Sequence, residues 1–462
     1  MIAAADFLKQ LVSEIGSDRV LTGDRIPSRC HTDWSGADPV MPLALVCPQS
    51  TQEVSRLLRL CSLHHVSVVP QGGLTGLAGA AVPIADGIAV SLERMNAIES
   101  IEPRAATLCV QAGATVQSVQ EAAIKVGLQF GVDFGARGSA QIGGAISTNA
   151  GGNGVLQYGM MREQVLGLEV VLADGTVLPM LRPMLKNNTG YDLKQWFTGA
   201  EGTLGVITRA VLRLRPLPQA KITALAALPD FDASLALLTR LSASLPGAIS
   251  AYELMWQDFF STSLSWQKLR DPFSKMHPMA VLLTVDGQSA EALHSALESV
   301  LADAMTAGEI VDVVIAQSQQ QARTLWKIRE ATAELSVYMH PPINFDVSLP
   351  LAEIGRFAED CRAALSQQWP GHQTIFFGHV ADGNLHISTD GATVAQALHD
   401  VESLVYRLVR SYGGSVSAEH GIGLHKKSYL SASRTEAELD VMRAVKQALD
   451  PTAIMNPGKV FD

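Results

Sequence analysis

Residues 131–159 have the sequence GVDFGARGSAQIGGAISTNAGGNGVLQYG, in which nine glycines are interleaved with Ser139, Ser147, Thr148 and Asn149. A packed core cannot use so many hydroxyls and missing side chains, because buried polar groups need hydrogen-bond partners. A long polar ligand lying across the backbone would satisfy these groups. The segment therefore predicts a domain that binds an extended polar ligand.

A second glycine cluster lies upstream, at Val68–Ala80 (VVPQGGLTGLAGA), directly after an apolar strand. Its glycines Gly72, Gly73, Gly76 and Gly79 permit close backbone approach, so that successive N–H groups can point into one concavity and hold a phosphate. Taken alone, the stretch fits an ordinary glycine-rich turn equally well. Neither cluster contains the GxGxxG of a nicotinamide-nucleotide fold, which argues against a doubly wound dehydrogenase.

The whole chain predicts an α+β protein of two main domains. Its 462 residues exceed the roughly 100 to 200 residues of one ordinary domain. Between Leu43 and Arg215, short β-branched runs predict strands, with amphipathic helices at 51–65 and 115–127 between them. After Pro218 the composition shifts and the strand-then-helix order repeats. The expected segments are an N-terminal helix and lead-in (1–40), the ligand-binding domain (41–218), a second α+β domain (219–432), and a C-terminal helix and loop (433–462).

Composition excludes several classes of protein. The formal charge of −10 comes without a basic run, which makes nucleic acid a poor partner. The five cysteines are scattered without a CxxC, so neither a disulfide framework nor an iron–sulfur cluster is indicated. Residues 1–20 lack the features of a signal peptide, and no stretch approaches the roughly 20 apolar residues needed to cross a bilayer. We expect a cytoplasmic protein without a transmembrane segment.

Five motifs of the first domain resemble the flavin domain of the vanillyl-alcohol-oxidase type. PQGGLTG, GARGSAQIGGAISTNAGG, LGLEVVLADGT, NTGYDLKQ and GAEGTLGVIT occur in the order and spacing found in the branch of D-2-hydroxyglutarate, D-lactate and glycolate dehydrogenases. The resemblance runs from roughly Met41 to Asp462. It implies a two-subdomain FAD-binding domain and an α+β substrate (cap) domain, with the C-terminal tail returning to the flavin domain.

The resemblance also implies where FAD binds. Residues 70–76 would contact the pyrophosphate, residues 133–152 would follow the isoalloxazine and ribityl chain, and residues 201–207 would close the site. Leu74 stands where the branch usually has asparagine, and neither Leu74 nor Thr75 can tether a flavin, so we expect FAD to be non-covalent. The expected FAD-binding residues are Pro70, Gly72, Gly73, Leu74, Thr75, Gly76, Asp133, Gly138, Ser139, Gly143, Gly144, Ser147, Thr148, Gly151, Gly152, Tyr158, Glu201, Gly205, Ile207 and Asn456.

The stretch GHVADGNLHI, Gly378–Ile387, contains two histidines on either side of turn-forming residues. If Ala-Asp-Gly-Asn forms a four-residue hairpin loop, His379 lies directly opposite His386 on one face. Such residues have Cβ atoms about 4.5 to 5.5 Å apart, so the two imidazoles could bind one metal ion. Two hydrogen-bonded core histidines are the alternative that the residues leave open. The other face, toward the core, would receive Val380, Leu385 and Ile387.

A third ligand is available in Ser417–Gly423 (SAEHGIG), which contains Glu419 and His420. The residues alone do not bring Glu419 to the hairpin, and a solvated loop carboxylate is the alternative. The resemblance supplies the assignment, because metal-bearing members show GHxGDGNLH and SAEHGxG. It implies His379, His386 and Glu419 as ligands of a divalent metal, with Zn²⁺ expected, and His420 as catalytic base. Such a set leaves positions open for a substrate.

The resemblance implies oxidation of a D-2-hydroxy acid to the 2-oxo acid, with hydride transfer to flavin N5. A helix expected over Leu325–Glu334 has Arg329 in its middle, and the resemblance assigns this arginine to the substrate carboxylate. A surface salt bridge is the alternative. Asn344 and Ser388 stand where 2-hydroxyglutarate members usually have lysine and asparagine, which removes the charge expected at a second carboxylate. The expected substrate is therefore D-2-hydroxyglutarate, D-lactate or a related acid, bound by Arg329, Asn344, Ser388 and His420.

Other functions and partners stay open. The same fold occurs in oxidases that use O₂, in glycolate oxidase-type flavoprotein subunits and in oxidases of other alcohols. The electron acceptor is expected to be an electron-transfer flavoprotein, a quinone or another carrier. The sequence does not report the oligomeric state, and the resemblance makes a homodimer the expectation.

Overall fold

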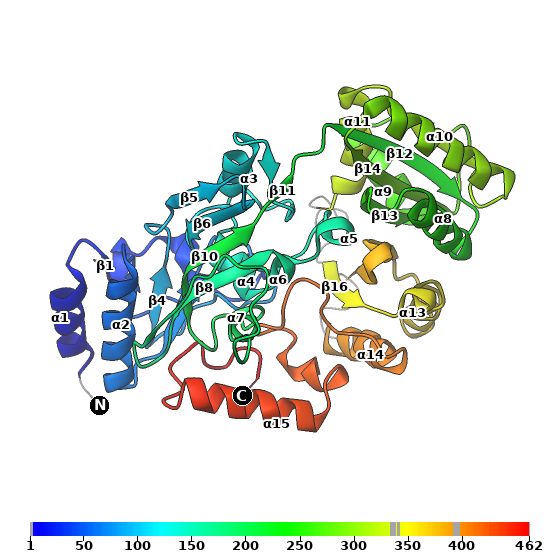
Figure 1. Cartoon of the computed structure of the whole chain (residues 1–462). Helices are drawn as coiled ribbons and strands as arrows, with labels where there is room; N and C mark the ends of the chain where they lie inside the picture. The colour runs from blue at the N-terminus through cyan, green and yellow to red at the C-terminus, as the bar shows by residue number, and fades with distance from the viewer. Residues whose placement is uncertain (1–2, 333–338, 340–341, 391–397, 462) are drawn as a thin grey trace. The chain divides into compact units, whose positions relative to one another are not determined.

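The computed structural model describes residues 3–332, 339, 342–390 and 398–461 (Figure 1). The chain forms two compact units. Unit 1 comprises Met1–Gly152, Gly159–Leu217 and Glu419–Asp462, and unit 2 comprises Asn153–Tyr158 and Pro218–Ala418. The break after Leu217 adjoins the expected boundary at 218. Unit 2 ends at Ala418, earlier than the expected 432, and it also includes residues 153–158.

Unit 1 contains a four-stranded sheet in the order β1 (Val20–Leu21), β2 (Ala44–Val46), β4 (Ile88–Ser91) and β3 (Val68–Gln71). β2, β4 and β3 run parallel, so the chain needs a crossover between β2 and β3. Helix α2 (Thr51–His64) provides it, and the Ser50 side chain caps this helix by accepting a hydrogen bond from the Glu53 N–H. Helix α1 (Ala4–Ile15) packs against α2.

A second sheet of unit 1 is antiparallel, in the order β5 (Ile98–Glu102), β6 (Thr107–Gln111), β10 (Val206–Arg213), β8 (Val165–Val171) and β9 (Val177–Met180). The Asp174-Gly175 sequence, typical of a tight hairpin, joins β8 to β9, with Gly175 at φ +85° in the turn. The β-branched runs predicted as strands between Leu43 and Arg215 form strands, whereas β5 and the short strand at residues 128–129 were not predicted. The remaining elements of unit 1 are α3 (Val116–Ile124), β7 (Leu128–Gln129) paired with β11 (Arg215–Pro216), α4 (Ile142–Ser147), α6 (Met161–Gln164), α7 (Lys194–Phe197), η1 (Gly23–Arg25), η2 (Ser28–His31), η5 (Lys427–Ala432) and α15 (Glu436–Leu449).

The C-terminal segment belongs to the core of unit 1. α15 starts with a capping box between Thr435 and Glu438 and ends before Asp450, as the Asp-Pro sequence predicts. The tail then runs beside β3, where the Val68 N–H donates to Ile454 O at 2.7 Å and the Asn456 N–H donates to Val68 O at 2.8 Å. The expected packing of the C-terminal tail on the first domain is therefore seen at β3.

Unit 2 is built on a sheet whose described strands are all antiparallel to their neighbours. The order is β15 (Asp312–Ile315), β12 (Ala220–Leu228), β14 (Met279–Gly287), β13 (Ile249–Trp256), β17 (Thr374–Gly378), β18 (Asn384–Asp390) and β16 (Pro342–Ser348). The strand-then-helix pairs expected after Pro218 are confirmed as β12 with α8 and β14 with α10. The strand β13 was not predicted.

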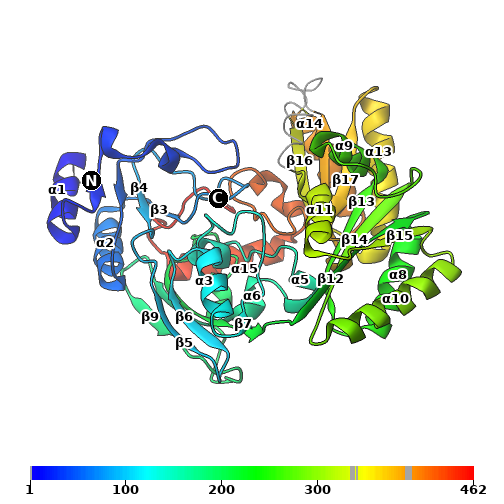
Figure 2. The same ribbon diagram turned by 90° about the horizontal axis from the view of Figure 1, so that it is seen from above.

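Helices cover both faces of this sheet. On one face, Trp256 of β13 stacks with Phe231 of α8 and Phe345 of β16 contacts Tyr406 of α14. On the other face, Phe377 of β17 stacks on Phe259 of α9. Figure 2 shows α8 and α10 on the opposite side of the strands from α9 and α11. The first face is covered by α8 (Phe231–Ser244), α10 (Ala290–Thr306), α13 (Ile354–Gln368) and α14 (Leu398–Ser411). The second face is covered by α9 (Gln257–Gln267) and α11 (Gln319–Glu330). The other elements of unit 2 are α5 (Val155–Tyr158), η3 (Leu351–Glu353) and η4 (Val380–Asp382).

None of the helices in the described ranges combines the length and apolar character that a membrane crossing requires.

Candidate active site

The two glycine clusters of unit 1 lie against each other. A Cβ added to Gly73 would meet the carbonyl oxygen of Ser139 at 2.0 Å, and one added to Gly72 would meet Gly144 Cα at 3.5 Å. Only glycine fits at position 73, because no real Cβ approaches an oxygen so closely. The loop that follows β3 is therefore packed directly on the residues that lead into α4.

The backbone of residues 72–76 fits the predicted pyrophosphate contact. Within the described part of the chain, the N–H groups of these five residues donate to no protein acceptor. Leu74 has φ +59°, a left-handed conformation in which successive N–H groups turn toward one side. Asparagine, usual in the resembled branch, adopts this conformation more readily than leucine. Leu74 is nevertheless buried beside Cys30 and Leu45, which accounts for an apolar side chain there.

Other predicted FAD-binding residues serve close packing or tail anchoring. Gly152 has φ +107° and would carry a Cβ 2.2 Å from Asp133 O, so this position requires glycine. Ile207 is a buried member of the core of unit 1. Asn456 donates from Nδ2 to the carbonyl oxygens of Glu201 and Ala80 at 2.7 and 3.0 Å. Tyr158 belongs to unit 2, where its hydroxyl is 3.4 Å from an Asp286 carboxylate oxygen.

Glu201, predicted to close the flavin site, is buried and has φ +50°. Its carboxylate accepts hydrogen bonds from the N–H groups of Ile422 and Gly423 at 2.8 and 2.9 Å. Burial raises the pKa of Glu201, although these two hydrogen bonds and the charges of Lys426 and Lys459 act in the opposite direction. Glu201 thus anchors the backbone directly after Glu419 and His420.

The histidine hairpin of unit 2 differs in register from the prediction. His386 of β18 pairs with Phe377 of β17, not with His379 as expected. β17 ends at Gly378, and the chain turns through η4 to Gly383, which has φ +88°. The turn is therefore longer than the expected Ala-Asp-Gly-Asn loop. The shift of two residues preserves the alternation of faces, so the prediction that apolar residues point to the core is confirmed for Val380, Leu385 and Ile387, which are fully buried.

The two imidazoles still meet, although their residues are not paired across the strands. The ring centroids of His379 and His386 are 5.5 Å apart with planes at 78°. His379 is buried and His386 is partly exposed. Unit 2 therefore brings together both histidines that the sequence selected as metal ligands.

A buried carboxylate that sequence reasoning missed contacts His379. Glu253 of β13 is 1% exposed; its Oε1 is 2.6 Å from His379 Nδ1, and its Oε2 accepts from Arg329 Nε at 2.7 Å. Burial alone would raise the pKa of Glu253, but the charges and hydrogen bonds of His379 and Arg329 outweigh it and hold the pKa at about 2. Arg329 is therefore not a surface residue. It is 7% exposed, lies in the last turn of α11, and has its guanidinium carbon 4.9 Å from the centre of the Phe377 ring. Residues 333 and 334 of the expected helix lie outside the described residues.

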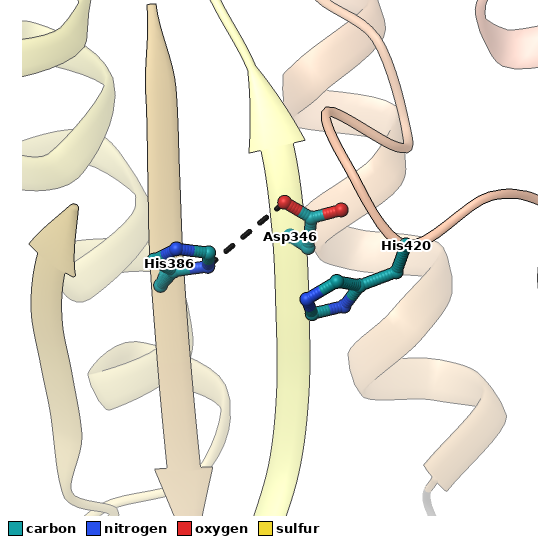
Figure 3. A group of neighbouring side chains, drawn as sticks. All are labelled: Asp346, His386 and His420. Atoms are coloured by element: carbon teal, nitrogen blue, oxygen red, sulfur yellow. Dashed lines mark ion pairs between the residues drawn. The ribbon is translucent and has the colours of Figure 1, made fainter. Parts of the chain in front are cut away.

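A second missed carboxylate lies beside His386. Asp346 of β16 is 1% exposed and forms an ion pair with His386 Nδ1 at 3.9 Å (Figure 3). It accepts hydrogen bonds from Asn384 Nδ2 at 2.7 Å and from the Ala418 N–H at 3.2 Å. Each histidine thus has an acidic residue at its Nδ1. The available signal in the sequence was a lone acid within each apolar strand, YELMW and INFDVS.

The two residues that replace the usual lysine and asparagine bind each other. Asn344 and Ser388 are directly opposite on β16 and β18, and Ser388 Oγ donates to Asn344 Oδ1 at 2.7 Å. Each is two residues from a site residue, Asp346 and His386 respectively, and so lies on the same face of the sheet. Asn344 is exposed and Ser388 is buried. The pair is polar and uncharged.

The predicted residues divide between the two units. His379, His386, Arg329, Asn344 and Ser388 belong to unit 2, whereas Glu419 and His420 begin the last segment of unit 1. Within unit 1, Glu419 Oε1 accepts a hydrogen bond from the Gly152 N–H at 2.8 Å.

Comparisons with known proteins agree with the fold and with the flavin. Residues 42–180 match the FAD binding domain family, and residues 217–460 match FAD linked oxidases, C-terminal domain. The chain is similar to D-2-hydroxyglutarate dehydrogenase of Xanthomonas citri pv. viticola, at 38% identity over 93% of this chain and 91% of that protein. The protein of the same name from Stutzerimonas stutzeri is 36% identical over 99% of both chains. The mitochondrial one of Rattus norvegicus is 36% identical over 96% of this chain and 82% of that protein. A solved alkyldihydroxyacetonephosphate synthase shares the fold, with a TM-score of 0.76 at 18% identity over 98% of this chain and 85% of that chain.

Proposed function

The chain belongs to the family of FAD-linked oxidases, and on that basis we propose that it is an FAD-dependent dehydrogenase that oxidises a D-2-hydroxy acid to the 2-oxo acid. The main structural support is the group of Arg329, Glu253 and His379 in unit 2. A fixed arginine beside a carboxylate-bonded histidine suits a substrate that has a carboxylate next to a hydroxyl. Bound FAD would accept the hydride at N5.

We assign the predicted FAD-binding residues as above, with residues 72–76 on the pyrophosphate. Their N–H groups support this assignment, since an anion can accept several of them at once. FAD is expected to be non-covalent, because the loop offers neither histidine nor cysteine.

A divalent metal, Zn²⁺ by preference, is assigned to His379, His386 and Glu419. The donor set fits such an ion, because imidazole and carboxylate are the usual ligands of catalytic zinc, and because Nδ1 of both histidines faces a carboxylate. A bound ion would lower the pKa of the substrate hydroxyl. The Glu419 assignment rests on the SAEHGIG motif.

The remaining steps belong to side chains. The two terminal nitrogens of Arg329 form a fork that can bind the substrate carboxylate by two parallel hydrogen bonds. His420 would accept the hydroxyl proton, since an imidazole is the side chain most often used as a general base. As the proton leaves, the Cα hydride departs and the carbonyl of the 2-oxo acid forms.

The far end of the substrate would meet Asn344 and Ser388. Because this pair is uncharged, the site favours a small or uncharged far end, as in D-lactate. The names of the relatives favour D-2-hydroxyglutarate instead. Both belong to the proposed class, and the panel below decides between them.

The test is a panel of D- and L-2-hydroxy acids assayed with an artificial electron acceptor, on metal-loaded and metal-stripped protein. We expect only D-forms to reduce the flavin, and only with metal present. Unchanged turnover after chelation would exclude the metal role. Turnover of a simple alcohol that survives Arg329→Ala would favour an oxidase of another alcohol on this fold, whereas a flavin that no hydroxy acid reduces would favour a noncatalytic flavoprotein subunit.

The physiological acceptor is expected to be an electron-transfer flavoprotein or a quinone, and a homodimer remains the expected assembly. The cytoplasm is the expected compartment, because the five cysteines are all free and four of them are buried.

A further inference from the structure

One buried carboxylate, that of Glu253, contacts two residues that have different proposed roles. Glu253 bonds His379 through Oε1 at 2.6 Å and Arg329 through Oε2 at 2.7 Å. These contacts join β13 to α11, where Arg329 is 76 positions from Glu253 in the sequence, and to the turn after β17, where His379 is 126 positions away. All three residues lie in unit 2, so the contacts belong to one compact body.

The contact with His379 determines which ring nitrogen can bind a metal. An ionised carboxylate can only accept hydrogen bonds, so the Glu253 contact places the imidazole proton on Nδ1. The lone pair is then on Nε2. Carboxylates in this position orient a metal-binding histidine and raise its basicity.

The contact with Arg329 determines the direction of the guanidinium. The Nε–H donates to Glu253, and the guanidinium carbon lies over the Phe377 ring at 4.9 Å from its centre. The bond from Nε and the position over the ring together restrict the orientation of the guanidinium. The opposite edge, formed by the terminal nitrogens, keeps a set orientation for a planar carboxylate.

We propose that Glu253 is a positioning residue that sets the metal-facing nitrogen of His379 and the carboxylate-binding fork of Arg329 together. This inference rests on the proposed function. It deepens that function by coupling two events: metal binding fixes His379, His379 fixes Glu253, and Glu253 holds Arg329 in place for the substrate. Substrate affinity should therefore depend on a residue that does not contact the substrate.

The central variant is Glu253→Gln, which keeps the shape but can accept through only one oxygen. Its amide either donates toward His379, which moves the ring proton to Nε2, or meets the Arg329 N–H with a second donor. We expect the dissociation constant for Zn²⁺, measured on metal-stripped protein by competition with a chromophoric chelator, to rise by about 10- to 100-fold. The KM for the best substrate of the panel should rise at saturating Zn²⁺.

The matched control is Glu309→Gln, which removes the charge from another carboxylate–arginine pair of unit 2. In that pair, Arg240 Nε donates to Glu309 Oε2 at 2.8 Å. It should leave the Zn²⁺ dissociation constant and KM within twofold of wild type. If Glu253→Gln fails to fold, as judged by circular dichroism and FAD content, Arg329→Lys tests the same coupling. This variant should weaken Zn²⁺ binding by about threefold or more, although Arg329 is not a proposed ligand.

The outcomes separate the two proposals. If wild type binds no Zn²⁺ and oxidises no D-2-hydroxy acid, the proposed function is wrong. If wild type does both, and neither Glu253→Gln nor Arg329→Lys changes Zn²⁺ affinity beyond the Glu309→Gln control, the positioning role is wrong. A rise in KM with unchanged Zn²⁺ affinity would also refute the coupling.

Discussion

Asn344→Lys is expected to shift substrate preference toward D-2-hydroxyglutarate. The change puts a cation at the edge of the site, where the Asn344–Ser388 pair is now uncharged. Asn344 is exposed, so the new ammonium would keep part of its hydration and need not displace the buried Ser388. A substrate with a second carboxylate gains an ion pair, whereas D-lactate has no group to form one.

The magnitude follows from the position of Asn344. For a half-solvated pair at about 4 Å and an effective dielectric constant of about 40, the attraction is about 2 kcal/mol. Ordering the lysine side chain takes back about 1 kcal/mol. The net gain of about 1 kcal/mol corresponds to about a fivefold increase in the ratio of kcat/KM for D-2-hydroxyglutarate to that for D-lactate.

Steady-state kinetics with an artificial acceptor give this ratio for wild type, Asn344→Lys and the matched control Asn344→Met. The methionine side chain is of similar length but uncharged, so the ratio should not increase. High salt should reduce the effect of lysine, because the pair is exposed to solvent. An equal response of both substrates, or the same increase with methionine, would refute the reasoning about the far end of the substrate.

Three further predictions concern unit 1. Gly73→Ala should lose bound FAD, measured by flavin absorbance, because the new Cβ would lie 2.0 Å from Ser139 O, whereas Gly135→Ala, with nothing within 4 Å of its Cβ, should retain it. Glu201→Ala should lower the free energy of unfolding in urea by about 3 kcal/mol or more, because two N–H groups lose a charged acceptor; a loss below about 1 kcal/mol would contradict the anchoring role. Burial lowers the pKa of Lys459 from 10.5 to about 8, so the unfolded chain binds this proton more tightly than the folded protein does. The free energy of unfolding should therefore be lowered by Lys459 below pH 8, and should rise by up to about 3 kcal/mol between pH 8 and 10.5. Lys459→Met should therefore be the more stable protein at pH 7, by about 2 kcal/mol after loss of the bond to Val82 O, and should lose this advantage by pH 10.5; a difference independent of pH would argue against a buried ammonium.

Local patterns predict much of the fold and part of the site. The helices of unit 1 can be predicted because their apolar spacing and their capping residues are close together in the sequence. The glycine clusters can be predicted to allow close backbone packing, and Gly73 does lie against the carbonyl oxygen of Ser139. The two histidines were selected from a ten-residue stretch, and the structure brings their rings together.

Long-range contacts account for what the sequence did not predict. The hairpin register depends on the turn through Gly383, whose length the dipeptide Asp-Gly does not determine. Glu253 contacts His379 across 126 positions, and no local pattern predicts that contact. The apolar run around it was a weak signal, since an unpaired charge in a buried strand would be too costly to keep, but it does not identify the partner.

The chain crosses between the two units four times, and this has a consequence for its synthesis. Unit 1 begins with the first helix and ends with the tail that pairs with β3 through Ile454 and Asn456. While the ribosome is still translating unit 2, the β3 edge of unit 1 lacks this neighbour. In the nascent flavin domain, this side of β3 therefore stays unpaired until residues 454–456 have left the ribosome. Within this sequence, β3 is therefore translated well before the residues that pair with it, because all of unit 2 is translated between them.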